Sequence, residues 1–319
     1  MDHLAHLTRK ATWILSCLLI SIPCSAPAQP GHHPARPSPG TILFKVTSPE
    51  HQNVSYLFGT HHAFGKAFFD TLCIANKALL ACDLYIQENL NLPGEMAEDI
   101  INERKKITRW KKYTSKDDLA FLTRLFATSP TDFQKMTPTE MHVFLNRYYK
   151  QQVCLNRSPE DPSLSLDEYI GTRAREQGLK LFGLETTRDQ IRLINQDVEG
   201  MPRRVHKRRL SHIIRKIRTG TPVDCEETDW YARMAVDYQW QEPCRNALML
   251  TDRNDRWMAI LSDLLEQHNC FIAVGLSHLM YECGLVSQLI RMGYVVTAIP
   301  LGHHKYNACL YDRPSLTWS

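Results

Sequence analysis

The stretch Tyr56-Leu57-Phe58-Gly59-Thr60-His61-His62 runs from an apolar segment of strand length through a glycine to a histidine three residues later. The stretch Ala273-Val274-Gly275-Leu276-Ser277-His278 repeats this order late in the chain. Glycine at a strand end lets the backbone turn tightly or lets another group approach it closely. In open α/β sheets, ligand and catalytic groups gather just beyond the carboxyl ends of the strands. The repeat therefore indicates an α/β sheet with His62 and His278 near one edge.

Two acidic residues follow apolar runs of the same kind. Glu88 ends the stretch Tyr85-Ile86-Gln87-Glu88, and Glu185 lies two residues after Gly183 in Leu181-Phe182-Gly183-Leu184-Glu185. A single residue of this kind is more often a turn or surface residue than a functional one. The repetition of the pattern favours a site, in which two histidines and two glutamates from four strand ends converge.

Apolar runs of strand length alternate with longer helical stretches along the chain. The expected strands are Ile42–Thr47, Val54–Phe58, Leu84–Gln87, Leu179–Phe182, Phe271–Val274 and Val295–Ile299. The first two are joined by a short polar turn, which predicts a hairpin. A helical insertion is expected over residues 93–177 and a second helical block over residues 187–268. This order predicts a mixed α/β fold with a central mixed sheet and flanking helices.

The N-terminus has the pattern of a secretory signal. Arg9 and Lys10 precede an apolar stretch that ends near Pro23, and the small-residue run Ser25-Ala26-Pro27-Ala28 follows. We therefore expect a signal peptide over residues 1–28, a flexible lead-in over 29–40 and a single domain over 41–319. The protein is expected to be exported, periplasmic or secreted, with no transmembrane helix in its mature chain.

Composition and cysteine content narrow the class further. The chain has 319 residues, 43% of them hydrophobic, and a net charge of +4, which is too mild to imply a nucleic-acid partner. Eight cysteines follow residue 28, and an even number in an exported chain suggests disulfide bonds. Cys270 and Cys283 flank one strand and turn and are a candidate pair. The alternative is that several cysteines are buried free thiols.

Several short motifs, taken in order, resemble the TraB/GumN family, which includes the Tiki proteases and bacterial pheromone-shutdown proteins. The motifs are Leu57–His62, Glu88, Leu184–Thr186, Asp252–Asn254 and Val274–Leu279. The resemblance extends from about Thr41 to Ile299. It implies a fold similar to the ChaN and erythromycin-esterase-like group, and in the Tiki branch a metal-dependent protease site.

Residue by residue, the resemblance matches His62 and His278 to the motif histidines, Glu88 and Glu185 to the motif acids, and Arg253 with Asn254 to an Arg-Asn pair. Imidazole and carboxylate ligands suit manganese, cobalt or zinc. We assign His62 and His278 as ligands, Glu88 as ligand or general base, and Glu185 as the other acid. Gly59, Gly183 and Gly275 are assigned structural roles.

A metal at this site would activate water and polarise a substrate carbonyl. The leading hypothesis is thus an exported metal-dependent hydrolase, a metalloprotease or peptidase with a peptide or protein substrate. The alternative is a cell-envelope protein that binds or sequesters a peptide or small ligand without cleaving it. The oligomeric state stays open.

Asn254 shares helical spacing with Met258, Leu261 and Leu265, so it is expected on an otherwise apolar stripe. An inward asparagine costs free energy unless it is hydrogen-bonded. Asn254 is therefore expected to orient a ligand or substrate, and Arg253 to hold an oxyanion or carboxylate. The alternative is a helix start, with Asp252 or Asn254 as the cap.

A basic run begins at Arg203 and continues to Arg218, with apolar residues at helical spacing between the charges. It predicts an amphipathic helix whose basic face is solvated, and leaves open a weak attraction to anionic lipid or envelope polymer. His142, His206 and His212 are expected on the surface. His303 and His304 follow the last expected strand and are not assigned to the site.

Overall fold

The computed structural model describes residues 40–157 and 165–302. The expected signal peptide lies outside the described residues, as do His303, His304 and Cys309. No helix in the described part of the chain is long and apolar enough to cross a membrane.

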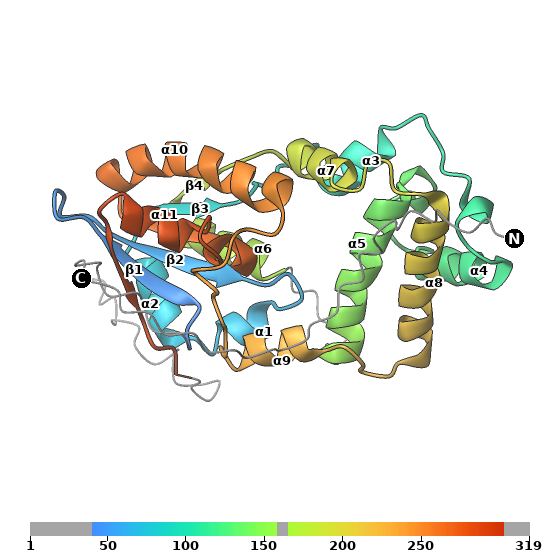
Figure 1. Ribbon diagram of the computed structural model, residues 1–319, viewed down its shortest axis with the longest axis horizontal. Coiled ribbons are helices and arrows are strands. Elements are labelled where there is room, and N and C mark those ends of the chain that lie inside the picture. The colour runs from blue at the N-terminus through green and yellow to red at the C-terminus, as the bar shows by residue number, and fades with distance from the viewer. Residues whose placement is uncertain (1–39, 158–164, 303–319) are drawn as a thin grey trace, which may run out of the picture. The chain divides into compact units, whose positions relative to one another are not determined.

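A six-stranded sheet in the order β4-β3-β5-β2-β1-β6 forms the centre of the fold (Figure 1). The strands are β1 Leu43–Thr47, β2 Val54–Thr60, β3 Leu84–Gln87, β4 Lys180–Gly183, β5 Cys270–Gly275 and β6 Val295–Ala298. Strand β1 is antiparallel to β2 and β6, whereas β2, β5, β3 and β4 are mutually parallel. The predicted strands and hairpin, and the mixed α/β class, are confirmed.

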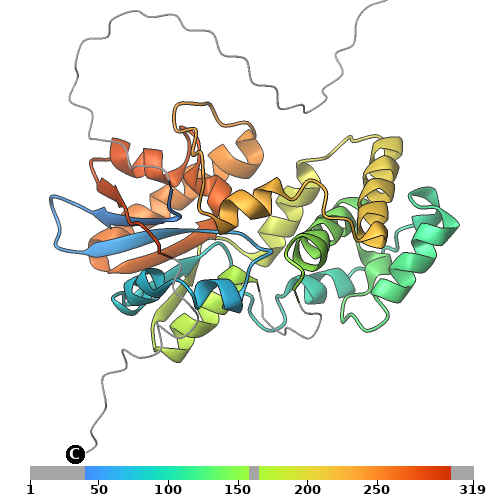
Figure 2. The ribbon, with the colours of Figure 1, turned by 90° about the horizontal axis from the view of Figure 1, so that it is seen from below.

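Helices cover both faces of the sheet, with α10 and α11 on one side and α2 and α6 on the other (Figures 1 and 2). Strands β3 and β5 lie between these layers and are buried almost throughout. Burial on both faces favours continuous apolar runs, which is why these parallel strands are visible in the sequence. The helices around the sheet are α1 Lys66–Phe69, α2 Cys73–Leu80, α6 Leu166–Glu176, α10 Asp252–Gln267 and α11 Leu285–Arg291, with the 3-10 turn η5 Leu276–Leu279.

The predicted helical insertion lies between β3 and β4. It contains α3 Ala97–Asn102, η1 Trp110–Lys112, α4 Lys116–Leu125, η2 Phe133–Lys135, α5 Pro138–Tyr149 and the π-helical turn η3 Lys150–Cys154, followed by α6. Helix α5 begins with a capping box in which Thr137 and Glu140 each accept from the other's backbone N–H, and Pro138 occupies the first turn.

The second helical block contains α7 Thr187–Gln196, α8 Arg203–Thr219, α9 Glu226–Ala232 and the π-helical turn η4 Ala247–Thr251, followed by α10. Helix α8 packs against α5, and both contribute to a second hydrophobic cluster that includes Met141, Leu145, Leu210 and Ile214. The amphipathic helix predicted from the basic run is therefore present as α8.

Disulfides join Cys154 to Cys225 and Cys244 to Cys283. Cys82 and Cys270 are buried free thiols. The expected pairing of Cys270 with Cys283 is wrong. Cys270 begins β5, and Cys283 follows the turn beyond its other end, so the six residues of the strand, which span roughly 20 Å, lie between them.

Candidate active site at the carboxyl edge of the sheet

The predicted site residues meet at one edge of the sheet. Because β2, β5, β3 and β4 are parallel, their carboxyl ends lie together, with Thr60 paired to Gly275 and Gln87 paired to Gly183. His62, His278, Glu88 and Glu185 all follow these strand ends within three residues.

Glycines allow close packing at this edge. The backbone N–H of Gly275 donates to Oε1 of Glu88 over 2.7 Å, and a Cβ at Gly275 would lie 3.0 Å from the same oxygen. A Cβ at Gly59 would lie 2.5 Å from Cδ1 of Leu276, and one at Gly183 would lie 3.0 Å from the backbone nitrogen of Leu90. A side chain at Gly59 would thus displace Leu276, and one at Gly183 or Gly275 would require its neighbour to shift by a few tenths of an ångström.

The guanidinium of Arg253 lies at the centre of the buried part of the site. Its Nη2 donates to Oε2 of Glu88 over 2.7 Å and to Oε1 of Glu185 over 2.5 Å, and its Nε donates to Oε2 of Glu185 over 3.2 Å. Its Nη1 donates to Nε2 of His278 over 2.9 Å and to the carbonyl of Met249 over 3.3 Å. All five N–H groups of Arg253 are therefore used within the protein.

His278 is held in a single tautomer. Asn254 donates its amide to the carbonyl of Cys283 over 2.9 Å, so its Oδ1 accepts from Nδ1 of His278 over 2.6 Å. Nε2 of His278 is then the acceptor for Arg253. Burial, together with the positive charge of Arg253, lowers the pKa of His278 to about 3, although Glu88 acts in the opposite direction. The imidazole is consequently neutral at neutral pH.

Glu88 is a buried carboxylate, 9% exposed, beside Arg253, which is 5% exposed. Burial acts to raise the pKa of Glu88, but the neighbouring His278 and the positive charge of Arg253 outweigh it and lower that pKa. Since His278 is itself neutral at neutral pH, Arg253 is the cation that keeps Glu88 ionised there. Gln190 adds a hydrogen bond of 3.0 Å to Oε2 of Glu88.

His62 forms the solvent-facing part of the site. Its Nδ1 lies 2.7 Å from Oδ2 of Asp167, and its side chain is 59% exposed. The negative charge of Asp167 raises the pKa of His62 above its usual 6.5, although partial desolvation of the ring by the surrounding protein acts in the opposite direction. The negative charge of Glu88 also raises the pKa of His62, so the His62–Asp167 pair and the buried cluster around Arg253 interact electrostatically.

Asp167 was not predicted from the sequence. It lies in the first turn of α6, accepts from the hydroxyl of Thr60, and accepts at its backbone carbonyl from the hydroxyl of Tyr85 over 3.1 Å. Burial would raise the pKa of Asp167, but the charge and hydrogen bond of His62 lower it, which keeps the carboxylate ionised. The sequence signal was the capping box of Ser165 and Glu168, which fixes the start of α6 and hence the first-turn position of Asp167.

His61 points away from this pair. Its Nε2 lies 3.1 Å from Oε1 of Glu227, which also pairs with Lys150. Burial would raise the pKa of Glu227, but these two partners lower it to about 2. His61 therefore ties the end of β2 to α9.

The predicted metal ligands do not fit a resident ion in this arrangement. Nε2 of His278 and both oxygens of Glu88 already accept from Arg253, Gly275 or Gln190. Among the described residues, no group of three or more His, Cys, Asp or Glu side chains is arranged to hold a metal. A cation at His278 and Glu88 would have to displace the guanidinium of Arg253.

The two expectations for Arg253 and Asn254 turn out differently. Asn254 is fully buried on α10 with Met258, Leu261 and Leu265, and it hydrogen-bonds His278, so the predicted inward, hydrogen-bonded asparagine is confirmed. The N-cap of α10 is Thr251, so neither Asp252 nor Asn254 caps the helix. Arg253 holds two carboxylates of the protein itself rather than presenting a free N–H to a ligand.

Comparison with known proteins gives a family-level assignment. Searches among curated proteins and among solved structures returned no significant match. The model of the TraB/PrgY/gumN family matches residues 42–298, which include all six strands and every residue of the site. The chain therefore belongs to the TraB/PrgY/gumN family.

Proposed function

We propose that this protein is an exported hydrolase of peptide bonds in which the imidazole of His62 transfers the proton and Asp167 positions that imidazole. The observation that carries the proposal is the hydrogen bond of 2.7 Å between an ionised, largely buried carboxylate and a solvent-exposed imidazole at the carboxyl edge of the sheet. No described residue hydrogen-bonds Nε2 of His62, so that nitrogen faces solvent as the basic atom.

The chemistry follows from this tautomer. Nε2 of His62 takes a proton from a water molecule as the water oxygen bonds to the carbonyl carbon of the substrate. The resulting imidazolium then gives that proton to the leaving nitrogen as the carbon–nitrogen bond breaks. Asp167 stays ionised throughout and stabilises the imidazolium through Nδ1.

The buried cluster around Arg253 positions the groups near His62 and raises the pKa of its imidazole. Arg253 fixes the carboxylates of Glu88 and Glu185. Glu88 also accepts a hydrogen bond from the backbone N–H of Gly275 and so fixes the turn after β5. The negative charge of Glu88 adds to that of Asp167 in raising the pKa of His62. We therefore assign Arg253, Glu88, Glu185, Asn254 and His278 to positioning and electrostatic roles.

The proposal is tested with a peptide library incubated with the purified chain in heavy-oxygen water. Hydrolysis incorporates the label into each new carboxylate, which mass spectrometry detects. His62→Gln and Asp167→Asn should each lower the initial rate, and loss of a general base is worth roughly 10²–10⁴-fold.

A second His-Asp pair provides matched controls. Nδ1 of His268 lies 2.9 Å from Oδ2 of Asp83. The two residues precede β5 and β3, at the amino ends of these strands and therefore at the edge of the sheet opposite the site. His268→Gln and Asp83→Asn make the same chemical changes and should leave the rate unchanged. Equal rates for the wild type and the His62→Gln variant would overturn the assignment.

A protein that binds a peptide without cleaving it is the second candidate. The observation in its favour is that Arg253 and Glu185 hydrogen-bond each other inside the protein. Neither group is therefore left free to react with a substrate. Saturable, equimolar loss of free peptide without labelled product would identify such a binding protein.

A manganese, cobalt or zinc requirement stays a prediction from the sequence. Elemental analysis of the untagged chain and of its His62→Ala and His278→Ala variants tests it. Stoichiometric metal that is lost in both folded variants would support one shared site, with Arg253 displaced.

A further inference from the structure

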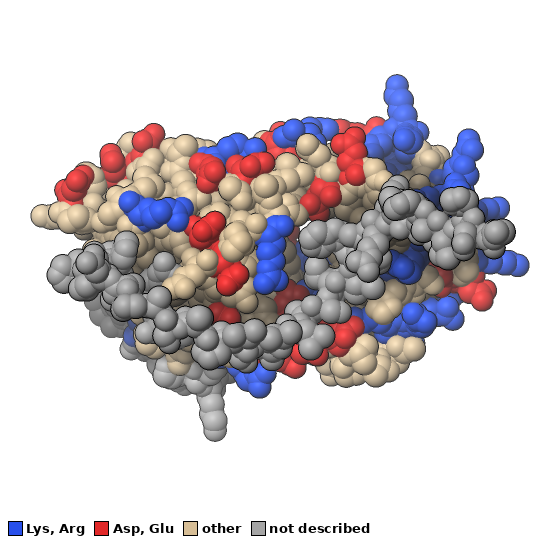
Figure 3. All heavy atoms as spheres, in the orientation of Figure 1, with Lys and Arg blue, Asp and Glu red and all other residues tan. Residues whose placement is uncertain are grey.

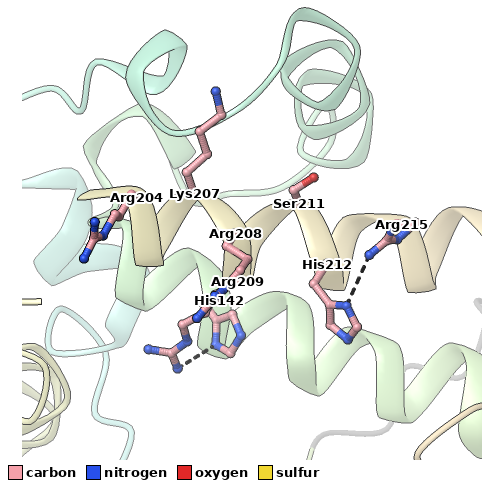
Figure 4. Close-up of a pocket in the computed structure, with 8 residues that line it drawn as sticks. All are labelled: His142, Arg204, Lys207, Arg208, Arg209, Ser211, His212 and Arg215. Carbon is pink, nitrogen blue, oxygen red and sulfur yellow. Dashed lines mark hydrogen bonds between the residues drawn. The ribbon is translucent and has the colours of Figure 1, made fainter. Parts of the chain in front are cut away.

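Helix α8 presents a stripe of basic residues along a shallow groove of about 690 Å³ (Figure 4). The groove is lined by Arg204, Lys207, Arg208, Arg209, Ser211, His212 and Arg215 of α8 and by His142 of α5. The opposite face of α8 carries Leu210, Ile213 and Ile214, which are buried in the second hydrophobic cluster. Packing against α5 therefore fixes the helix with its charged side outward.

The polar side chains that line the groove are hydrogen-bond donors. Arginine can only donate, so Nδ1 of His142 accepts from Nη2 of Arg209 over 3.3 Å, and Nδ1 of His212 accepts from Nη2 of Arg215 over 3.4 Å (Figure 4). In both rings the hydrogen consequently lies on Nε2. Guanidinium, ammonium and imidazole N–H groups thus line the groove, and Ser211 adds a hydroxyl.

The groove contains no compensating acid. Among the residues that the structure describes, Arg204, Lys207, Arg208, Arg209 and Arg215 form no salt bridge, whereas Lys216 and Arg218 near the end of the helix pair with Asp224 and Asp118. Basic side chains also gather on the surface around α4 and α8 (Figure 3). A hollow lined by one sign of charge concentrates counter-ions of the other sign.

We propose that this groove binds a ligand that carries phosphate groups. Planar guanidinium groups match the oxygens of phosphate and can contact them in pairs, and several unpaired cations favour a multiply charged anion over a single carboxylate. A soluble polyphosphate and phospholipid headgroups both present this chemistry. The site is separate from the sheet edge, so it stands independently of the proposed hydrolase activity.

Calorimetric titration of the full chain with tripolyphosphate tests for a soluble ligand. Sedimentation with vesicles of phosphatidylglycerol in phosphatidylcholine, against phosphatidylcholine alone, tests for a lipid source. Either form of binding should weaken as salt is added, because each contact with a phosphate releases counter-ions.

The double variant Arg208→Gln/Arg215→Gln should weaken binding by about ten-fold or more, since each charged hydrogen bond that is lost reduces affinity. Arg188→Gln/Arg192→Gln on α7 is the matched control, because it removes the same charge from residues that are 66% and 65% exposed. Circular dichroism checks that both variants are folded.

Binding of tripolyphosphate that only the groove variant weakens supports a soluble phosphate ligand. Binding to the anionic vesicles alone, again weakened only in the groove variant, supports a phospholipid headgroup. Absence of binding to both probes, or equal weakening in the two double variants, overturns the proposal.

Discussion

Replacement of Arg253 by leucine should destabilise the protein more than any other single change in the site. The side chain of Arg253 is 6% exposed and neutralises Glu88 and Glu185, whose side chains are 11% and 7% exposed. Removing it leaves two buried carboxylates without a cation and Nε2 of His278 without a donor. Breaking a buried pair in this way costs about 3–5 kcal/mol.

The assay is urea unfolding at neutral pH with the disulfides intact, followed by circular dichroism. In a parallel thermal melt, the unfolding entropy of about 2.1 cal/mol/K per residue makes this loss a fall in Tm of roughly 5–8 °C for a chain of 319 residues. Arg188→Leu, at a side chain that is 66% exposed, should change the free energy of unfolding by less than about 0.5 kcal/mol.

The charge explanation has its own control. Adding Glu88→Gln and Glu185→Gln to Arg253→Leu removes the unpaired charges, so the triple variant should recover part of the lost stability. A free energy of unfolding within about 1 kcal/mol of the wild type for Arg253→Leu alone would refute the reasoning, because the carboxylates would then not depend on this cation.

Three further predictions concern single interactions. Asp167→Asn removes the charge that raises the pKa of His62, so that pKa should fall; an NMR titration assigned with His62→Gln measures it, and an unchanged value would contradict the pairing. Burial and the neighbouring Arg209 lower the pKa of His142 to about 4, so its contribution to stability is present above pH 6.5 and is lost as pH falls towards 4. In His142→Asn the free energy of unfolding should therefore depend less on pH between 6.5 and 4, by up to about 3 kcal/mol compared with the wild type. Parallel pH dependences for the two proteins would exclude the effect. The disulfide between Cys244 and Cys283 closes a separation of 39 residues, so Cys244→Ala/Cys283→Ala should lose about 3–4 kcal/mol of unfolding free energy, and unchanged stability would show that the bond contributes nothing.

The strands and the shared edge could be predicted because local sequence determines them. The strands that became β2, β3 and β5 are apolar runs of the right length, and glycines mark the turns at Gly59 and Gly275. Parallel strands bring their carboxyl ends together whatever their order, so the convergence of His62 and His278 did not require knowledge of the topology.

The partners within the site could not be predicted because they depend on tertiary packing. Asp167 reaches His62 across 105 residues of sequence, and its carboxylate lies on a helix that has no motif of its own beyond the capping box. The helical stripe predicted that Asn254 points inward, but it did not show that its neighbour Arg253 also turns inward. Arg253 turns inward because it pairs with Glu88 and Glu185, the carboxylates that follow β3 and β4.

The cysteine pairing failed for a related reason. Proximity in sequence suggested Cys270 and Cys283, yet a strand holds its two ends apart. The actual partner, Cys244, comes from the segment that precedes α10, and Cys283 also accepts a hydrogen bond from Asn254. Topology rather than spacing decides which thiols meet.

The pH dependence of peptide cleavage in the wild type and in Asp167→Asn tests the central claim most directly. His62 must be unprotonated to accept a proton, so the wild-type rate should rise with pH through the raised pKa of His62. In Asp167→Asn the maximal rate should fall and the rising limb should move to lower pH. Identical profiles for the two proteins, or peptide captured in equimolar amount without any cleavage, would contradict the account.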